Sequence, residues 1–180
     1  LFHHRERGIT TTVHSDDFTT CGPKMQLDWF ESALAERYEL TRGGRLGPAP
    51  EDDKEATVLN RVVRWTAQGL EMEADPRQAE KLLRDLKLNG DGVKAAASPG
   101  VRATKEQLEG DAALDASKCT PYRAVVARAN YLASDRPELQ FSSKEVCRWM
   151  SSPTDLSLAA LKRLGRFVKV HQRLVYYYPW

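Results

Sequence analysis

The sequence predicts an α+β fold, and three observations lead to this class. Short segments rich in β-branched residues are concentrated in the first half of the chain, three amphipathic helical patterns fill residues 119–180, and a stretch rich in Gly, Ala, Ser and Asp separates them. We therefore expect one unit at residues 1–89, a linker at residues 90–118 and a helical unit at residues 119–180.

The composition is that of a globular protein and excludes several other classes. Hydrophobic residues make up 41% of the 180 residues, and no apolar run approaches the roughly 18 residues of a membrane span. The net charge of +2 is too small to indicate a nucleic-acid partner by itself. The start at Leu1, without an apolar leader, is interpreted as that of a fragment.

The cysteines favour a reducing, intracellular setting. Cys21, Cys119 and Cys147 are odd in number and widely spaced. They predict neither a disulfide framework nor the paired ligand spacing of a zinc site.

Residues 9–20 predict a β-hairpin. Ile, Thr, Val and Phe flank a polar centre, so Ser15, Asp16 and Asp17 are placed at or near the bend. A Gly-Pro pair at residues 22–23 ends the second strand. An amphipathic helix of about four turns should follow, because apolar residues recur at helical spacing at Leu27, Phe30, Leu34 and Tyr38.

A loop and a second strand pair are expected next. Residues 41–53 hold clustered glycines and prolines, which indicate a loop. Residues 58–65 and 70–75 form the strands, joined by a turn at residues 66–69. In the second strand apolar and acidic residues alternate, so one face, carrying Glu71, Glu73 and Asp75, is expected to be solvated.

The following helix has a clear start signal. Asp75 can cap it, Pro76 suits the first helical position, and Gln78 stands where a capping box has Glu or Gln. Asn89-Gly90 should end it. Its buried stripe is expected to be Ala79, Leu82, Leu83 and Leu86, and a further short helix is expected in the linker near residues 104–108.

Prolines are expected to open the three helices of the last unit, at Thr120-Pro121, at Pro137 and after Pro153. Arg136, before the second of these, should tie down the preceding turn. Residues 174–178 predict a final edge strand. The expected inward-facing residues are Val125, Ala129 and Leu132 in the first helix and Leu158, Leu161, Leu164 and Val168 in the third.

Adjacent carboxylates on an exposed turn are the main candidate for chemistry. Asp16 and Asp17 repel each other unless a cation lies between them, and Mg²⁺ prefers one or two carboxylates together with phosphates and water. Two such ions can stabilise the attacking and leaving oxygens of phosphoryl transfer. Taken alone, however, an Asp-Asp pair is more often an ordinary turn.

The surrounding motifs resemble those of copia-type retrotransposon reverse transcriptases. His14-Ser15-Asp16-Asp17 is similar to the family's Tyr-x-Asp-Asp hairpin. YRAVVARANYLASDRPELQFSSKEVCRWMSSP, at residues 122–153, is similar to its Tyr-Arg…Tyr-Leu-Ala-x-x-Arg-Pro-Asp…Arg-Phe-Met-x-x-Pro block. Lys162-Arg163-Leu164 and Arg166-Phe167-Val168 resemble its Lys-Arg…Arg-Tyr-Leu. The order and spacing of these motifs, from Thr11 to Pro179, carry the resemblance.

This resemblance implies a fragment of an RNA-directed DNA polymerase from a Pol polyprotein. Residues 1–89 would be a partial palm, an antiparallel hairpin sheet with packed helices, and residues 119–180 a helical thumb and connection. Asp16 and Asp17 would bind catalytic Mg²⁺ or Mn²⁺. The implied partners are a primer–template, deoxynucleoside triphosphates, and protease, ribonuclease H and integrase domains, in the cytoplasm or nucleus.

The family's third aspartate would precede Leu1, so the chain alone should be inactive. The alternative is a catalytically inactive relic or a nucleic-acid-binding module. His14 stands where the family has a tyrosine near the primer–template. A basic face at spacings of four, three and four, equally consistent with phosphate contact and with an ordinary solvated surface, comprises Lys162, Arg166, Lys169 and Arg173.

Overall fold

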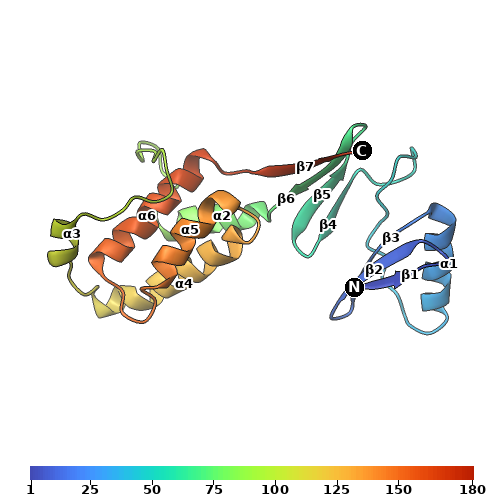
Figure 1. Cartoon of the computed structure of the whole chain (residues 1–180), viewed down its shortest axis with the longest axis horizontal. Coiled ribbons are helices and arrows are strands. Elements are labelled where there is room, and N and C mark those ends of the chain that lie inside the picture. Colours follow the sequence, from blue (N-terminus) through green and yellow to red (C-terminus); the bar gives the residue numbers. More distant parts are fainter.

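The computed structural model describes all residues, 1–180, as an α+β protein with two small antiparallel sheets and six helices. Figure 1 shows a small lobe at the N-terminal end, a helical part at the opposite end, and the second sheet between them. None of the helices combines the length and the apolar character needed to cross a bilayer.

The N-terminal lobe contains the expected hairpin and one strand more. Strands β1 (Phe2–His4), β2 (Ile9–His14) and β3 (Asp17–Cys21) form a sheet in that order. The β2–β3 pair is the hairpin predicted from the sequence. Helix α1 (Lys24–Ala35) follows Pro23 but is shorter than predicted, because Tyr38 lies beyond its end.

The second sheet has four strands and corrects the sequence prediction. Its order is β4 (Glu55–Val58), β5 (Arg61–Trp65), β6 (Gly69–Glu73) and β7 (Val175–Pro179). The single strand expected at residues 58–65 is interrupted, since Leu59 and Asn60 have φ angles of 48° and 66°. Two successive residues with positive φ form the two-residue turn that fits the twist of a hairpin.

Strand β7 joins this sheet from about 100 residues further along the chain, a separation that loop closure permits at modest entropic expense. The predicted edge strand is therefore confirmed, and its partner is β6, with Leu70 opposite Tyr178 and Met72 opposite Tyr176. A Cβ atom at residue 69 would collide with the Tyr178 carbonyl oxygen. Glycine at this position thus allows the two strands to approach.

The expectation of a solvated acidic face on β6 is wrong for Glu73 and Asp75. The Glu73 side chain is only 4% exposed, and Arg64 Nη1 and Arg173 Nη2 donate to its Oε2 at 2.9 and 2.7 Å. Hydrogen bonding by Arg173, and then by Arg64, lowers the pKa of Glu73. Asp75 is buried at the start of the next helix, which it caps by accepting from the Arg77 backbone N–H at 3.0 Å.

The helical part begins where Asp75 caps α2, as predicted. The helix that Pro121 was expected to open starts a turn earlier, where the Asp115 carboxylate accepts from Ser117 N–H, so that Pro121 lies inside it. The linker helix and the helix that starts at Pro137 are confirmed. The helices are α2 (Pro76–Asp85), α3 (Lys105–Glu109), α4 (Ala116–Ala133), α5 (Pro137–Cys147) and α6 (Asp155–Val170).

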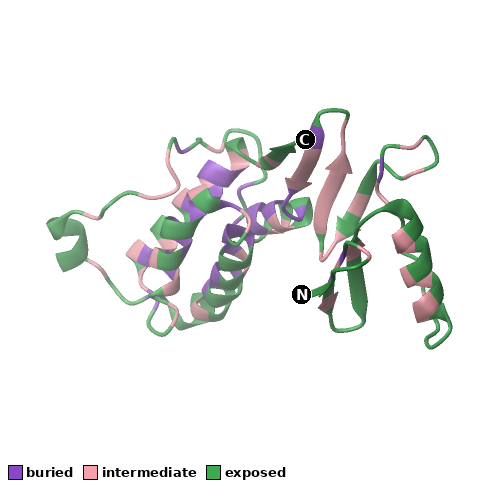
Figure 2. Ribbon diagram, turned by 45° about the vertical axis from the view of Figure 1, so that its right-hand side comes forward, coloured by how far each residue is buried: buried purple, intermediate pink, exposed green.

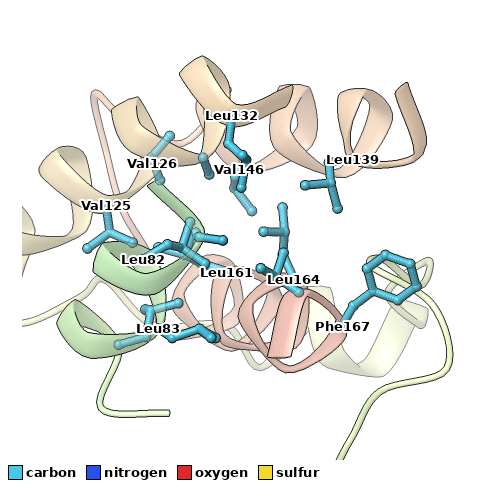
Figure 3. Packing of buried hydrophobic residues seen from close by; sticks show 14 of the residues in the cluster. Leu82, Leu83, Val125, Val126, Leu132, Leu139, Val146, Leu161, Leu164 and Phe167 are labelled. Atoms are coloured by element: carbon cyan, nitrogen blue, oxygen red, sulfur yellow. The ribbon is translucent and has the colours of Figure 1, made fainter. Parts of the chain in front are cut away.

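One hydrophobic core lies among α2, α4, α5 and α6 (Figure 3). All of the buried apolar side chains except Ile9 belong to this cluster of 20 residues. Figure 2 shows that the buried residues are concentrated in the helical part and are few in the N-terminal lobe. Residues 90–118 are more than a linker, because Ala96 and Leu114 contribute to the core.

Candidate active site

The β2–β3 hairpin presents Asp16 and Asp17 at the tip of the N-terminal sheet. His14 and Asp17 are directly opposite each other, which leaves Ser15 and Asp16 as a two-residue loop. Ser15 has a φ of 58°, a conformation that non-glycine residues rarely adopt. The two strands are therefore joined by a two-residue turn, with Asp16 in the turn and Asp17 at the start of β3.

Both aspartate side chains are exposed, and neither forms a hydrogen bond or ion pair with another residue. The strands beneath them are held in register by backbone pairing and by a 3.1 Å contact between Thr11 Oγ1 and Thr20 Oγ1. Thr11 is itself buried. The hairpin backbone therefore has a defined register, and the carboxylate oxygens of Asp16 and Asp17 remain available for an external ligand.

The donor set at the tip fits part of a magnesium site. No group of three or more His, Cys, Asp and Glu side chains in the chain is arranged to hold a metal ion. Two free carboxylates do match the one or two that Mg²⁺ takes when water and substrate phosphates fill its other positions. His14, exposed at the end of β2, lies opposite Asp17 and is the nearest ring to the pair along this strand.

An apolar hollow of about 770 Å³ lies beside the hairpin. It is bounded by the β1–β3 sheet and by α1, and its lining includes Val13, Phe18, Trp29 and Phe30. Phe18, directly after Asp17, is 45% exposed. The surface beside the hairpin strands is therefore largely apolar and open, although Arg5 and Glu6 also line it.

The predicted basic face of the last helix is only partly assembled. Lys162 is exposed and Arg166 is half-buried on α6, and neither forms a hydrogen bond or ion pair. Lys169 Nζ donates to the Gly90 carbonyl oxygen at 2.5 Å. Arg173 is a correction, because α6 ends at Val170 and the Arg173 guanidinium binds the buried Glu73. Arg173 instead belongs to the second sheet, because its ion pair with Glu73 holds the chain just before β7 against the end of β6.

Sequence reasoning missed a basic cleft between α2 and the end of α6. Arg77, Lys81 and Arg84 follow one another at spacings of four and three on α2, and together with Lys169 they line a cleft of about 440 Å³. The spacing was visible in the sequence, opposite the Leu82-Leu83 stripe. What it could not reveal is that α6 packs beside this face.

No protein-family model, curated protein or solved structure matches the chain. The resemblance to copia-type reverse transcriptases therefore rests on motifs in the sequence. The positions of the hairpin tip and of the basic surfaces are properties of the structure and do not depend on that resemblance.

Proposed function

We propose that this chain is part of an RNA-directed DNA polymerase of the copia type, and that Asp16 and Asp17 supply carboxylates for two-metal nucleotidyl transfer. The observation that carries the proposal is the hairpin tip, where two carboxylates adjacent in sequence are exposed and unpartnered on a tight two-residue turn. Two like charges that are adjacent in sequence and have no counter-charge repel each other, and a divalent cation would relieve that repulsion.

In this proposal the two aspartates and His14 have different roles. Asp16 and Asp17 would hold Mg²⁺ or Mn²⁺, and His14, which lies opposite Asp17, would contact the primer–template. The bound ions would stabilise the charge on the attacking and leaving oxygens. The hairpin contributes positioning, on which phosphoryl transfer chiefly depends. A third carboxylate would come from a preceding part of a longer Pol polypeptide that also carries protease, integrase and ribonuclease H domains.

The decisive experiment restores a longer polypeptide that includes the upstream polymerase region and measures primer extension on an RNA template. The Asp16→Asn, Asp17→Asn double variant should lose activity by several orders of magnitude, because it keeps side-chain size but removes the metal-binding charge. A matched control is the Asp91→Asn, Glu36→Gln double variant, which removes two exposed carboxylates elsewhere. That control should extend primers normally, and the 180-residue chain alone should extend none.

Near-normal extension by the Asp16→Asn, Asp17→Asn variant would place the active site elsewhere. The second candidate function is a nucleic-acid-binding module without catalysis, and the basic cleft on α2 and α6 favours it. Duplex binding without any aspartate-dependent extension in the restored polypeptide would select that alternative.

A further inference from the structure

The cleft between α2 and α6 gathers cations from two helices that are far apart in sequence. Arg77, Lys81 and Arg84 line one side, and Lys169 approaches from α6. Glu80 is the single carboxylate among the lining residues, against four cations. The two helices pack directly on each other through the hydrophobic core, so the arrangement is fixed by the fold.

Part of this positive charge is available to a ligand. Lys81 forms no hydrogen bond or ion pair, and Arg84 lies 3.7 Å from Asp85, which is also 3.3 Å from Arg128. The acceptor that Lys169 binds, a backbone carbonyl oxygen, carries no net charge. Arg77 is the exception, since its guanidinium donates to both oxygens of the Asp75 carboxylate. The cleft thus offers two lysines that have no carboxylate partner, together with Arg84, which shares the single charge of Asp85 with Arg128.

We propose that this cleft binds the phosphodiester backbone of a nucleic acid. Lys81 and Arg84 are three residues apart, or about 4.5 Å along the helix axis, and a nucleic-acid strand carries one phosphate per roughly 3.4 Å of rise. One or two successive phosphates therefore fit along the helix, and Lys169 lines the same cleft. The choice of nucleic acid as the polyanion rests on the proposed function.

The residues that line the cleft also indicate that it does not recognise bases. Leu83 is its only hydrophobic residue, and no aromatic ring is present on which a base could stack. Arginine and lysine contacts to phosphate oxygens give affinity and position but carry no sequence information. The cleft should therefore bind duplexes without regard to sequence, and it should do so separately from the Asp16-Asp17 tip.

The test measures binding of the 180-residue protein to a labelled duplex of random sequence, by fluorescence anisotropy across a salt series without divalent metal. The Lys81→Gln, Arg84→Gln variant should flatten the log–log salt dependence by about two units and weaken binding roughly 10- to 100-fold near 0.1 M salt. The matched control, Arg102→Gln, Lys118→Gln, also removes one arginine and one lysine from exposed positions. It should bind like the parent.

Thermal unfolding of each variant shows whether the variant is still folded. The single variant Lys81→Gln breaks no hydrogen bond or ion pair, and it should still flatten the log–log salt dependence by about one unit. Competition at equal ionic strength identifies the source of the phosphate. Unlabelled duplex should displace the probe, whereas inorganic phosphate and polyglutamate should not.

Equal binding by the cleft variant and its control would overturn the inference, as would absence of binding by the parent. Displacement by phosphate would mean a small-anion site, and displacement by polyglutamate a site for acidic polymers; each outcome contradicts the proposal. Aspartate-dependent primer extension together with an inert cleft would reject this inference alone. An active cleft without such extension would reject only the proposed polymerase function.

Discussion

At the scale of single residues, buried charges fix the path of the chain between α6 and β7. Arg136 is 1% exposed, and its Nη2 and Nη1 donate to the carbonyl oxygens of His171 and Gln172 at 2.6 and 3.1 Å. The next residue, Arg173, binds Glu73. Three successive residues are thereby held, and the chain leaves the helical core in the direction that brings β7 onto β6.

From the ion pairs of Glu73 with Arg64 and Arg173 we predict a specific dependence of stability on pH. Because Arg173 and Arg64 lower the pKa of Glu73 below the ordinary glutamate value of 4.5, these ion pairs stabilise the fold fully above that value and progressively less as the pH falls through the lower folded pKa. Glu73→Gln should therefore reduce the free energy of unfolding by about 1–3 kcal/mol near pH 7. Urea unfolding should show this difference shrinking near pH 3.

The exposed Glu36 provides the control for this experiment, since it forms no ion pair. Glu36→Gln should leave stability near pH 7 almost unchanged. A parent–variant difference at Glu73 that stays constant between the two pH values would show that its carboxylate does not depend on the two guanidinium groups.

At the scale of elements, helix α4 shows how a capping residue overrides a helix-starting signal. Asp115 accepts from Ser117 N–H at 2.9 Å, which begins the helix ahead of Thr120. Pro121 then sits at an interior position, where it has no N–H to donate to the Ser117 carbonyl and its ring crowds that oxygen. The helix tolerates this because its other face is buried in the core at Tyr122, Val125 and Val126.

Pro121→Ala should consequently stabilise the protein. Restoring the missing hydrogen bond and removing the crowding should raise the free energy of unfolding by about 1–3 kcal/mol. The melting temperature would then rise by roughly 2–10 °C for a chain of this size. Scanning calorimetry of Pro137→Ala is the matched control, because Pro137 occupies the first position of α5 and little change is expected there. If both variants melt alike, Pro121 opens α4 after all.

At the scale of the whole molecule, stability is unevenly distributed. The helical part holds the 20-residue core, while the N-terminal lobe buries Ile9 and Thr11 and relies on polar contacts. One such contact places the Arg7 guanidinium 3.6 Å from the centre of the Trp29 ring, and another is its 2.7 Å hydrogen bond to Gln26. Contacts of this kind contribute little individually.

Hydrogen exchange should reveal this division directly. Amides of β1, β2, β3 and α1 should exchange through local opening of low free energy, whereas those of α4, α5 and α6 should approach the protection set by global unfolding. Mass spectrometry of peptic peptides from residues 1–35 and 116–170 would make the comparison. Equal protection of the two regions would mean that the molecule unfolds as one cooperative unit.

Local signals predicted most of the elements. The hairpin at residues 9–20, the cap at Asp75, the short helix after Thr104 and the periodic leucines of α6 all depend on neighbouring residues, so the sequence alone indicates them. The turn at Leu59-Asn60 was missed because leucine rarely adopts positive φ. For the candidate site, the order of residues was enough to place Asp16 and Asp17 on a hairpin.

What the sequence by itself determined is therefore the α+β class, the helices with their apolar faces, and the adjacent carboxylates at a turn. Only the tertiary structure decided that β7 pairs with β6, that Glu73 is buried between two arginines, and that Lys169 joins the α2 cations in one cleft. The physical reason is range. Helix periodicity and turn chemistry act over a few residues, whereas strand partners, buried ion pairs and clefts depend on which distant surfaces the core brings together.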